Sequence, residues 1–360
     1  MSPVYLDHNA TSPPRPEALE VALPLITEHW GNPASTHQAA RRPAAAVEVA
    51  RGQVARWCGA RPRDVIFTSG ATEANHLALR GALGGGRLVV SAVEHPSVRA
   101  PGLALGASVA PVDADGVVDL DALDALLTPD VRLVSVMAAN NETGVIQPLT
   151  AIHARVHAAG ALLHVDAAQL PGRLPAPQAW DLLTLTAHKA GGLKGAGALV
   201  LRPGVALTPQ QLGGPQERER RAGTVNAAPI AALGAILDLP IPGHLGALQD
   251  RLAEGLSGLG AVVTAASRAR LPNTVHVRFP GIPGDSIVMG LDLTGVQVSV
   301  GAACASGAAR PSHVLAAMGL PPGEGVRMSL GWNTEKGEID RAVHATRRVL
   351  AQHEAASEVI

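Results

Sequence analysis

Aromatic side chains are nearly missing from this sequence. Only 2% of its 360 residues are Phe, Trp or Tyr, although 47% are hydrophobic. A large core can therefore form, but it has to be packed mainly from Ala, Val and Leu. The length exceeds the roughly 150 residues of a typical domain, which favours two domains.

Cysteine is also rare, since Cys58 and Cys304 are the only two. A pair of cysteines in a cytoplasmic protein is not expected to form a structural disulfide. No Cys/His set has the spacing of a zinc finger, so no metal site is predicted. Cys58 ends an apolar helical stretch and is predicted to be a buried structural thiol.

An excess of positive charge and long apolar runs are both absent. The formal net charge of -1 disfavours a direct nucleic-acid or membrane partner. Gly, Pro or charge interrupts every apolar stretch before the ~18 residues of a membrane span. Residues 1–11 lack the basic and apolar regions of a signal peptide. We therefore expect a soluble, cytoplasmic protein.

Lysine is the rarest charged residue, and it occurs only at Lys189, Lys194 and Lys336. Arginine serves elsewhere as the surface cation. Lysine can lose its proton and act as a nucleophilic amine, whereas arginine cannot. A retained lysine is therefore a candidate reactive group, and its position in the fold has to decide whether it is one.

Short apolar segments alternate with helical patterns through the first two thirds of the chain. Several segments are apolar throughout, which is typical of strands buried on both faces of a parallel sheet. We predict strands over 64–68, 87–91, 131–137, 162–166, 182–186 and 198–201, and helices over 43–57, 73–80, 119–127 and 150–159. This order predicts an α/β domain with a mainly parallel sheet covered by helices, and ligands at the carboxyl ends of its strands.

The Pro- and Gly-rich segment 239–243 predicts a domain boundary. Residues 14–240 are assigned to the large domain. Residues 1–13 and 241–360 are assigned to a smaller α+β domain. Its predicted helices cover 244–256, 285–291 and 334–350, and its strands lie near 262 and over 274–278, 296–299 and 326–330.

Two predicted strands end in residues that suit pyridoxal phosphate. Asp166 ends one strand and can pair with a protonated pyridine nitrogen. Lys189 follows the next strand and can form a Schiff base with the cofactor aldehyde. Lys194, in the following loop, is predicted to be structural.

The segment 68–73 runs from a strand through small residues into a helix, which can seat a phosphate on free backbone N–H groups. Thr72, Thr186 and His188 can add donors. The alternative is an ordinary helix with a Thr cap.

Three further candidates follow strand ends. His95 can stack on a cofactor ring and move protons, although a capping histidine is the alternative. An amide from 140–144, or Gln169, can contact the ring hydroxyl, although 140–144 also fits an Asx turn.

Cys304 lies among Gly, Ala and Ser, without the apolar pattern that would bury it. Such a loop suits an accessible thiolate nucleophile, although an inert cysteine is the alternative. Arg327, in a short predicted strand, can hold a substrate carboxylate with two hydrogen bonds.

Together these motifs resemble the cysteine desulfurases, pyridoxal phosphate enzymes of the class V aminotransferase family and fold type I. Within them the chain is similar to the subgroup that supplies sulfur for iron–sulfur clusters. The resemblance covers 5–11, 31–35, 68–75, 140–144, 164–169, 188–189, 221–224, the Cys304 loop and 332–335.

The resemblance implies a role for each matched residue. Lys189, Cys304 and His95 would be catalytic, and Cys304 can also contact an iron–sulfur cluster transiently. Asp166 would face the pyridine nitrogen, and Arg327 would hold the substrate. The remaining cofactor contacts would be Ala71, Thr72, Asn141, Gln169, Thr186, His188 and Thr224. Thr224 would reach the phosphate of a neighbouring subunit, which implies a homodimer.

The implied reaction converts L-cysteine to L-alanine and leaves a persulfide on Cys304 for a sulfur acceptor. The acceptor is either an iron–sulfur scaffold or a tRNA-thiolation relay. Selenocysteine lyase, another class V aminotransferase or lyase, and a non-catalytic scaffold are the alternative hypotheses.

Overall fold

The computed structural model of the chain describes residues 3–301 and 311–357. Its largest element is a seven-stranded sheet in the order β2-β8-β7-β6-β5-β3-β4. The strands are β2 (Val65–Thr68), β3 (Arg87–Ser91), β4 (Ser108–Ala110), β5 (Val131–Ser135), β6 (Leu162–Asp166), β7 (Leu182–Thr186) and β8 (Gly197–Leu201). The strands from β4 to β7 pair in parallel, whereas β8 pairs antiparallel with both β7 and β2. The predicted mainly parallel α/β sheet is confirmed.

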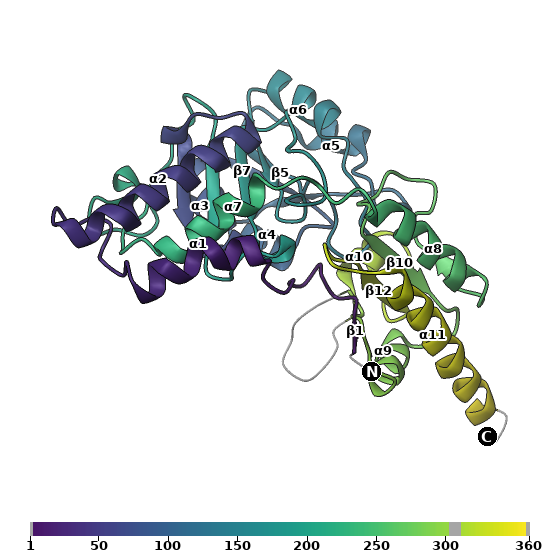
Figure 1. Cartoon of the computed structure of the whole chain (residues 1–360). Helices are drawn as coiled ribbons and strands as arrows, with labels where there is room; N and C mark the ends of the chain where they lie inside the picture. Colours follow the sequence, from purple (N-terminus) through teal and green to yellow (C-terminus); the bar gives the residue numbers. More distant parts are fainter. Residues whose placement is uncertain (1–2, 302–310, 358–360) are drawn as a thin grey trace.

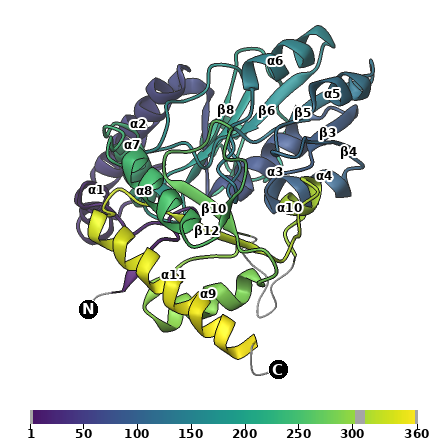
Figure 2. The same ribbon diagram turned by 90° about the vertical axis from the view of Figure 1, so that its right-hand side faces the viewer.

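Helices cover both faces of this sheet (Figures 1 and 2). They are α1 (Pro16–Thr27), α2 (Gln38–Cys58), α3 (Ala71–Ala82), α4 (Pro96–Ala104), α5 (Leu120–Leu126), α6 (Leu149–Ala158) and α7 (Ala227–Leu237). Side chains alternate between the faces along a strand. Val65 and Phe67 therefore pack into one core with α1, α2, α6 and α7, whereas Ile66 packs into a second core with α3 and α4.

The second part of the chain builds a smaller α+β unit. It contains β9 (Val262–Val263), β10 (Thr274–Arg278), β11 (Val296–Gln297) and β12 (Gly325–Ser329), with α8 (Leu245–Ser257), α9 (Gly284–Leu293), α10 (His313–Ala317) and α11 (Lys336–Ser357). The N-terminal strand β1 (Val4–Tyr5) pairs in parallel with β11. Val4 and Leu6 share one core with α8, α9 and α11. Figure 1 shows both chain termini beside this unit.

Several element bounds differ from the predictions for physical reasons. Helix α2 begins at Gln38 rather than at Pro43, and burial of Ala40 and Pro43 offsets the cost of a proline inside the helix. The apolar helix α7 has no predicted counterpart. Nearly all of its residues are buried, so its sequence has no polar face to reveal a helical period.

Three short 3₁₀ segments, Pro62–Asp64, His188–Ala190 and Gln216–Glu219, complete the described elements. Among residues 3–301 and 311–357, no helix combines the length and the apolar character needed to cross a bilayer.

Candidate active site

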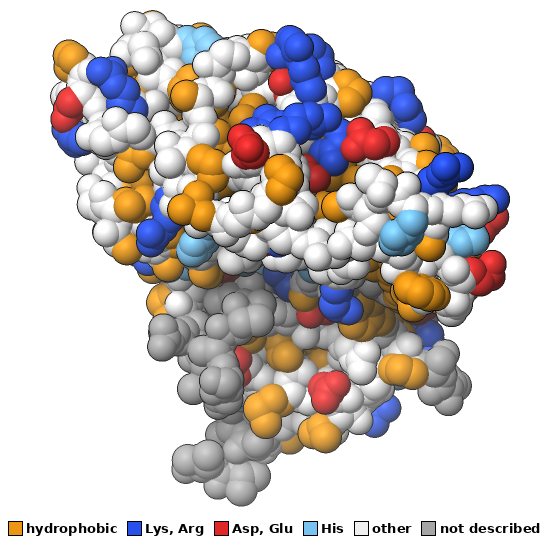
Figure 3. Space-filling view, turned by 90° about the vertical axis from the view of Figure 1, so that its left-hand side faces the viewer, with side chains coloured by type: hydrophobic (Ala, Val, Ile, Leu, Met, Phe, Trp, Pro, Cys, Tyr) orange, Lys and Arg blue, Asp and Glu red, His pale blue; other side chains and the backbone are white. Residues whose placement is uncertain are grey.

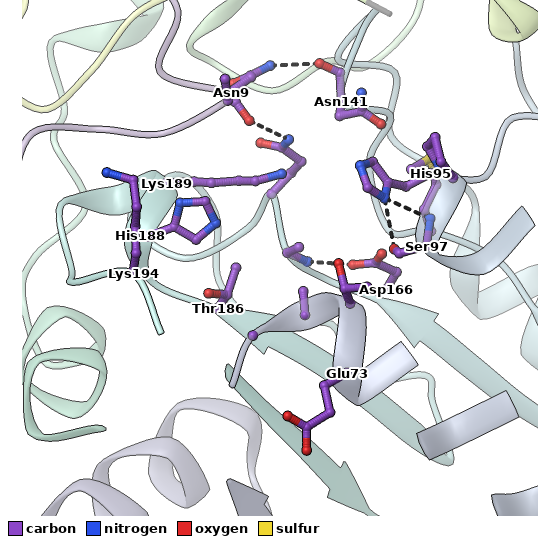
Figure 4. A pocket seen from close by; sticks show the side chains of 18 of the residues that line it. Asn9, Glu73, His95, Ser97, Asn141, Asp166, Thr186, His188, Lys189 and Lys194 are labelled. Atoms are coloured by element: carbon purple, nitrogen blue, oxygen red, sulfur yellow. Dashed lines mark hydrogen bonds between the residues drawn. The ribbon is translucent and has the colours of Figure 1, made fainter. Parts of the chain in front are cut away.

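A cavity of about 550 Å³ opens at the carboxyl ends of β6 and β7. Its wall combines the first turn of α3, the start of α4, the segments after β6 and β7, and residues from the small unit. The side chains that line it include Asn9, Thr72, His95, Ser97, Asn141, Asp166, Gln169, Thr186, His188, Lys189, Lys194 and Arg327. Figure 4 shows His95, Asp166 and Lys189 around the same space. The structure thus brings together most of the predicted site residues.

Lys189 lies in the 3₁₀ segment that follows β7, where the strand ends at the cavity. Burial lowers the pKa of its amine to about 8, and Arg173 and Arg327 add to this while Asp166 opposes it. About a tenth of the amine is therefore unprotonated at pH 7, far more than for an ordinary lysine. A neutral amine is the form that condenses with an aldehyde and accepts a proton.

Asp166 is held at the end of β6 by two hydrogen bonds. Its Oδ1 accepts from the Ala168 backbone N–H at 2.9 Å, and its Oδ2 accepts from Asn75 Nδ2 at 2.8 Å. The carboxylate is buried yet lines the cavity. It is placed to accept a further hydrogen bond from a donor on a ligand, such as a pyridinium N–H.

A chain of hydrogen bonds continues from Asp166 through Asn75 and Ser97 to His95, and Figure 4 shows its last link, between Ser97 and His95. Asn75 Nδ2 also donates to Ser97 Oγ at 2.9 Å, and Ser97 Oγ lies 2.8 Å from His95 Nδ1. The Ser97 backbone N–H donates to the same nitrogen at 3.1 Å. Nδ1 therefore acts as an acceptor, which places the ring proton on Nε2.

The charge state of His95 agrees with this arrangement. Burial lowers its pKa to about 4, and the neighbouring Lys189 lowers it further while Asp166 opposes the shift. The ring is therefore neutral at physiological pH. His95 caps α4, as one of the two expectations had it, and its side chain also lines the cavity.

The start of α3 offers a phosphate seat. Gly70 precedes the helix, no side chain caps it, and Ala71 and Thr72 in its first turn line the cavity. Their backbone N–H groups and the helix dipole favour an anion. Gly197 of β8 packs against this turn, and a Cβ there would lie 2.5 Å from the Gly70 carbonyl carbon. A side chain at position 197 would therefore displace the seat.

The other predicted phosphate donors differ in whether their side-chain hydrogens are available to a ligand. His188 lines the cavity, and burial lowers its pKa to about 4. Thr186 also lines it, but its hydroxyl donates to the Ala196 carbonyl at 2.8 Å instead of pointing its hydrogen at a ligand. Lys194, which is predicted to be structural, is exposed and lines the cavity.

The segment 140–144 is predicted either to form an Asx turn or to contact a ring hydroxyl, and Asn140 and Asn141 differ in this respect. Asn140 Oδ1 accepts the backbone N–H groups of Glu142 and Thr143, so Asn140 forms the Asx turn. Asn141 lines the cavity beside Asn9, whose Nδ2 donates to its carbonyl at 3.1 Å. Only Asn141 is therefore a candidate for contact with a ring hydroxyl.

Gln169 also lines the cavity, but its amide is already engaged. Its Nε2 donates to the Asn9 carbonyl at 3.2 Å, and its Oε1 accepts from Arg173. One amide hydrogen remains for a ligand.

Arg327 projects from β12 and is 1% exposed. It donates to the Asn141 carbonyl at 2.9 Å and forms a 2.6 Å ion pair with Asp7. Its buried Nε has no hydrogen-bond partner among the described residues. Because Arg327 also lines the cavity, its guanidinium is a candidate for contact with a substrate carboxylate.

Among the described residues, one predicted site residue does not lie in this cavity. Thr224 is exposed and is not part of the wall. Cys304 lies outside the described residues. The other thiol, Cys58, is buried and donates to the Val54 carbonyl, and burial raises its pKa to about 12.

The donor set fits pyridoxal phosphate. A neutral amine, a carboxylate and a helix N-terminus lie around one cavity, and they match the aldehyde, the pyridine nitrogen and the phosphate of this cofactor.

The model of the class-V aminotransferases matches residues 4–342. The chain belongs to this family. Enzymes of the family depend on pyridoxal phosphate.

The similarity to known proteins extends over nearly the whole chain. A cysteine desulfurase of Cereibacter sphaeroides is 44% identical over 99% of this chain and 98% of its own. A solved structure titled NifS-like protein superposes with a TM-score of 0.90 at 32% identity, over 97% of this chain and 99% of that one. A structure titled SspA in complex with cysteine gives a TM-score of 0.80 at 29% identity, over 91% and 98% of the two chains.

Asn75 and Ser97 are site residues that the sequence analysis missed. Both are ordinary helix residues by pattern, and their role depends on three elements meeting behind the cavity. Asn9 is similar, because its partners Asn141 and Thr274 are remote in sequence.

Proposed function

We propose that this chain is a pyridoxal-phosphate-dependent cysteine desulfurase that converts L-cysteine to L-alanine. The single observation that carries the proposal is the juxtaposition of Lys189, Asp166 and Arg327 around one cavity. The names of the relatives favour cysteine over selenocysteine as the substrate and favour an enzyme over a scaffold.

Pyridoxal phosphate, when bound, supplies an aldehyde that condenses with amines and a ring that accepts electrons from the substrate. The helix start at Ala71 and Thr72 would bind its phosphate, and Asp166 would accept a hydrogen bond from its ring nitrogen. Arg327, which lines the cavity, would bind the carboxylate of cysteine. Lys189, about half unprotonated at pH 8, would take the proton from the substrate α-carbon.

His95 is placed to hold a proton at the opposite side of the site. Its Nε2–H is the donor that faces away from Ser97, because Nδ1 is occupied. As a neutral ring it can donate a hydrogen bond from Nε2–H to a developing anionic atom.

The sulfur step uses Cys304. Its thiolate attacks the substrate sulfur, the substrate C–S bond breaks, and a new S–S bond forms on Cys304. The carbon that loses sulfur gains a proton, so cysteine plus one thiol yields alanine plus one persulfide. The persulfide would pass to an iron–sulfur scaffold or a tRNA-thiolation relay, in a homodimer located in the cytoplasm.

The predicted domain division supports this use of the chain. Residues 1–13 and 241–360 would carry the Cys304 loop, and residues 14–240 would carry the cofactor. The core shared by Val4, Leu6 and the helices after residue 245 supports that division.

The test compares Cys304→Ala with the matched variant Cys58→Ala. We expect Cys304→Ala to retain the cofactor absorbance but to lose alanine formation by more than about a hundredfold, because it removes the nucleophile. Cys58→Ala, which removes a buried thiol, should keep both. Full alanine formation in Cys304→Ala would contradict the sulfur-transfer role, and a protein that takes up no pyridoxal phosphate would contradict the whole proposal.

A further inference from the structure

Three potential metal ligands lie together at the end of the sheet opposite the cavity. His153 and His157 are one turn apart in α6, so their rings project from the same face of the helix. Asp181 directly precedes β7, whose other end leads to Lys189. Because β7 has five residues, about 17 Å of strand separates Asp181 from the cavity end.

The positions of the three side chains suit the binding of one shared metal ion. His157 Nε2 lies 2.8 Å and His153 Nε2 lies 3.9 Å from Asp181 Oδ2, and one ligand atom from each residue falls within 4.8 Å of the others. In a tetrahedral zinc site with bonds of about 2.0 Å, neighbouring ligand atoms are about 3.3 Å apart. The two distances to Asp181 Oδ2 lie on either side of that value, so small side-chain rotations bring all three into place.

Hydrogen bonding alone leaves one histidine unexplained. Only His157 reaches the carboxylate at hydrogen-bond distance, whereas the His153 ring packs against His157 with centroids 3.8 Å apart and planes tilted by 38°. Two imidazoles crowded beside one carboxylate oxygen are accounted for if both coordinate the same ion.

Burial and charge also favour an ion here. The Asp181 side chain is 9% exposed, and its Oδ2 is fixed by the Leu163 backbone N–H at 2.8 Å. The His153 and His157 side chains are 26% and 46% exposed, which leaves a path from solvent.

The nearby cation Arg202 is engaged elsewhere. Its guanidinium lies 3.8 Å from the centre of the Trp180 ring and donates to the carbonyls of Trp180, Gly59 and Gln178. Its donors are therefore directed away from the histidines.

We propose that His153, His157 and Asp181 bind one zinc ion, with water as the fourth ligand. Two imidazoles and one carboxylate form a ligand set that zinc accepts, and cobalt(II) is its spectroscopic substitute. The ion would fasten α6 to the start of β7 and would stabilise the large domain. It would take no part in catalysis, because it lies at the opposite strand ends from Lys189.

The experiment titrates the pyridoxal-phosphate-loaded protein with cobalt(II) and follows the visible d–d bands of tetrahedral cobalt. The double variant His153→Ala/His157→Ala is compared with His244→Ala/His344→Ala, which removes two exposed histidines elsewhere. Asp181→Asn tests the carboxylate separately. Retained cofactor absorbance verifies that each variant is folded.

We expect one equivalent of tetrahedral cobalt in the wild type and in the control variant. Binding should weaken at least about tenfold in the double variant and in Asp181→Asn, because even outer partners of metal ligands are worth 10–100-fold. Zinc should raise the unfolding temperature of the wild type and of the control variant, and it should not raise that of the double variant or of Asp181→Asn. No saturable binding, or equal binding in the double variant, would overturn the proposal and leave a hydrogen-bonded contact between α6 and β7. Neither result bears on the desulfurase activity.

Discussion

At the scale of single residues, the site is defined by altered protonation and by unpaired donors. The Lys189 amine is buried beside two arginines, so its neutral form is favoured, while the neighbouring Asp166 offers only partial compensation. Arg327 retains one buried N–H without a partner among the described residues. Both features cost stability in the free protein and become favourable when a ligand supplies the missing partner.

The pKa of Lys189 predicts how cofactor capture depends on pH. The neutral amine attacks the aldehyde, and its fraction rises as the pH passes through about 8 rather than through the usual 10.5. We expect the capture rate of the cofactor-free protein to rise roughly tenfold from pH 7 to pH 9 and then to level off. Stopped-flow absorbance with pyridoxal phosphate measures this rate.

Lys189→Arg and Lys194→Ala are the controls for this prediction. Arginine does not deprotonate in this range, so Lys189→Arg should form no covalent adduct. Lys194→Ala should keep the same pH profile with weaker phosphate binding. A rate that continues to climb beyond pH 10 would contradict the lowered pKa.

At the scale of elements, the site depends on the meeting of the end of β6 with the first turns of α3 and α4. Asp166 closes β6, Asn75 lies in α3, and Ser97 is in the first turn of α4. Asn75 is fully buried and donates to both of the others, so one amide fixes the distance between a strand and a helix. The proton position on His95 follows from this packing.

Ser97→Ala tests whether that chain orients His95. Without the hydroxyl, the Asn75 amide loses its link to His95, and the ring can rotate or change tautomer. We expect kcat to fall about three- to tenfold with little change in KM, in line with the loss of one hydrogen bond of about 1 kcal/mol. Steady-state kinetics across pH 6 to 9 measure both constants.

Ser97→Thr keeps the hydroxyl and should recover most of the activity. An unchanged kcat in Ser97→Ala would show that the backbone N–H alone fixes the ring. A loss of cofactor absorbance would instead indicate damage to the pocket.

At the scale of the whole molecule, exposed apolar residues remain on the large domain. Leu212 is 84% exposed and Trp30 is 75% exposed. Gln211 Nε2 donates to the Ala222 carbonyl at 2.8 Å, so Leu212 lies in a loop that is tied close to the exposed Thr224. Figure 3 shows hydrophobic side chains exposed among charges of both signs on the face that lies at left in Figure 1. These features support the proposed homodimer, in which Thr224 reaches a partner's phosphate seat.

Mixed subunits test this arrangement. Thr224→Ala and Lys189→Ala chains should each form poor sites alone. In a mixed dimer, however, the chain that keeps Lys189 also receives an intact Thr224 from its partner. We expect the co-refolded mixture to bind more pyridoxal phosphate and to show more activity than either variant by itself, because one site of the two is restored. Light scattering should give twice the 36.7 kDa chain mass. A monomeric mass, or no gain on mixing, would contradict the shared site.

Local sequence determined the parts of this protein that depend on one element at a time. The buried strands, and the polar residues that end them, are legible because a five-residue strand fixes which residue reaches the sheet edge. Asp166 and Lys189 are therefore found from sequence. So is the phosphate seat at Ala71, since a helix N-terminus is a local feature.

Tertiary structure decided whatever depends on elements that meet from distant parts of the chain. The hydrogen-bond chain through Asn75 and Ser97 and the entry of Lys194 into the cavity wall left no local pattern. The cluster of His153, His157 and Asp181 is of the same kind, because its third member lies on another element. Spacing along the sequence does not specify which side chains a folded sheet brings within reach of one another, and the packing of the elements does.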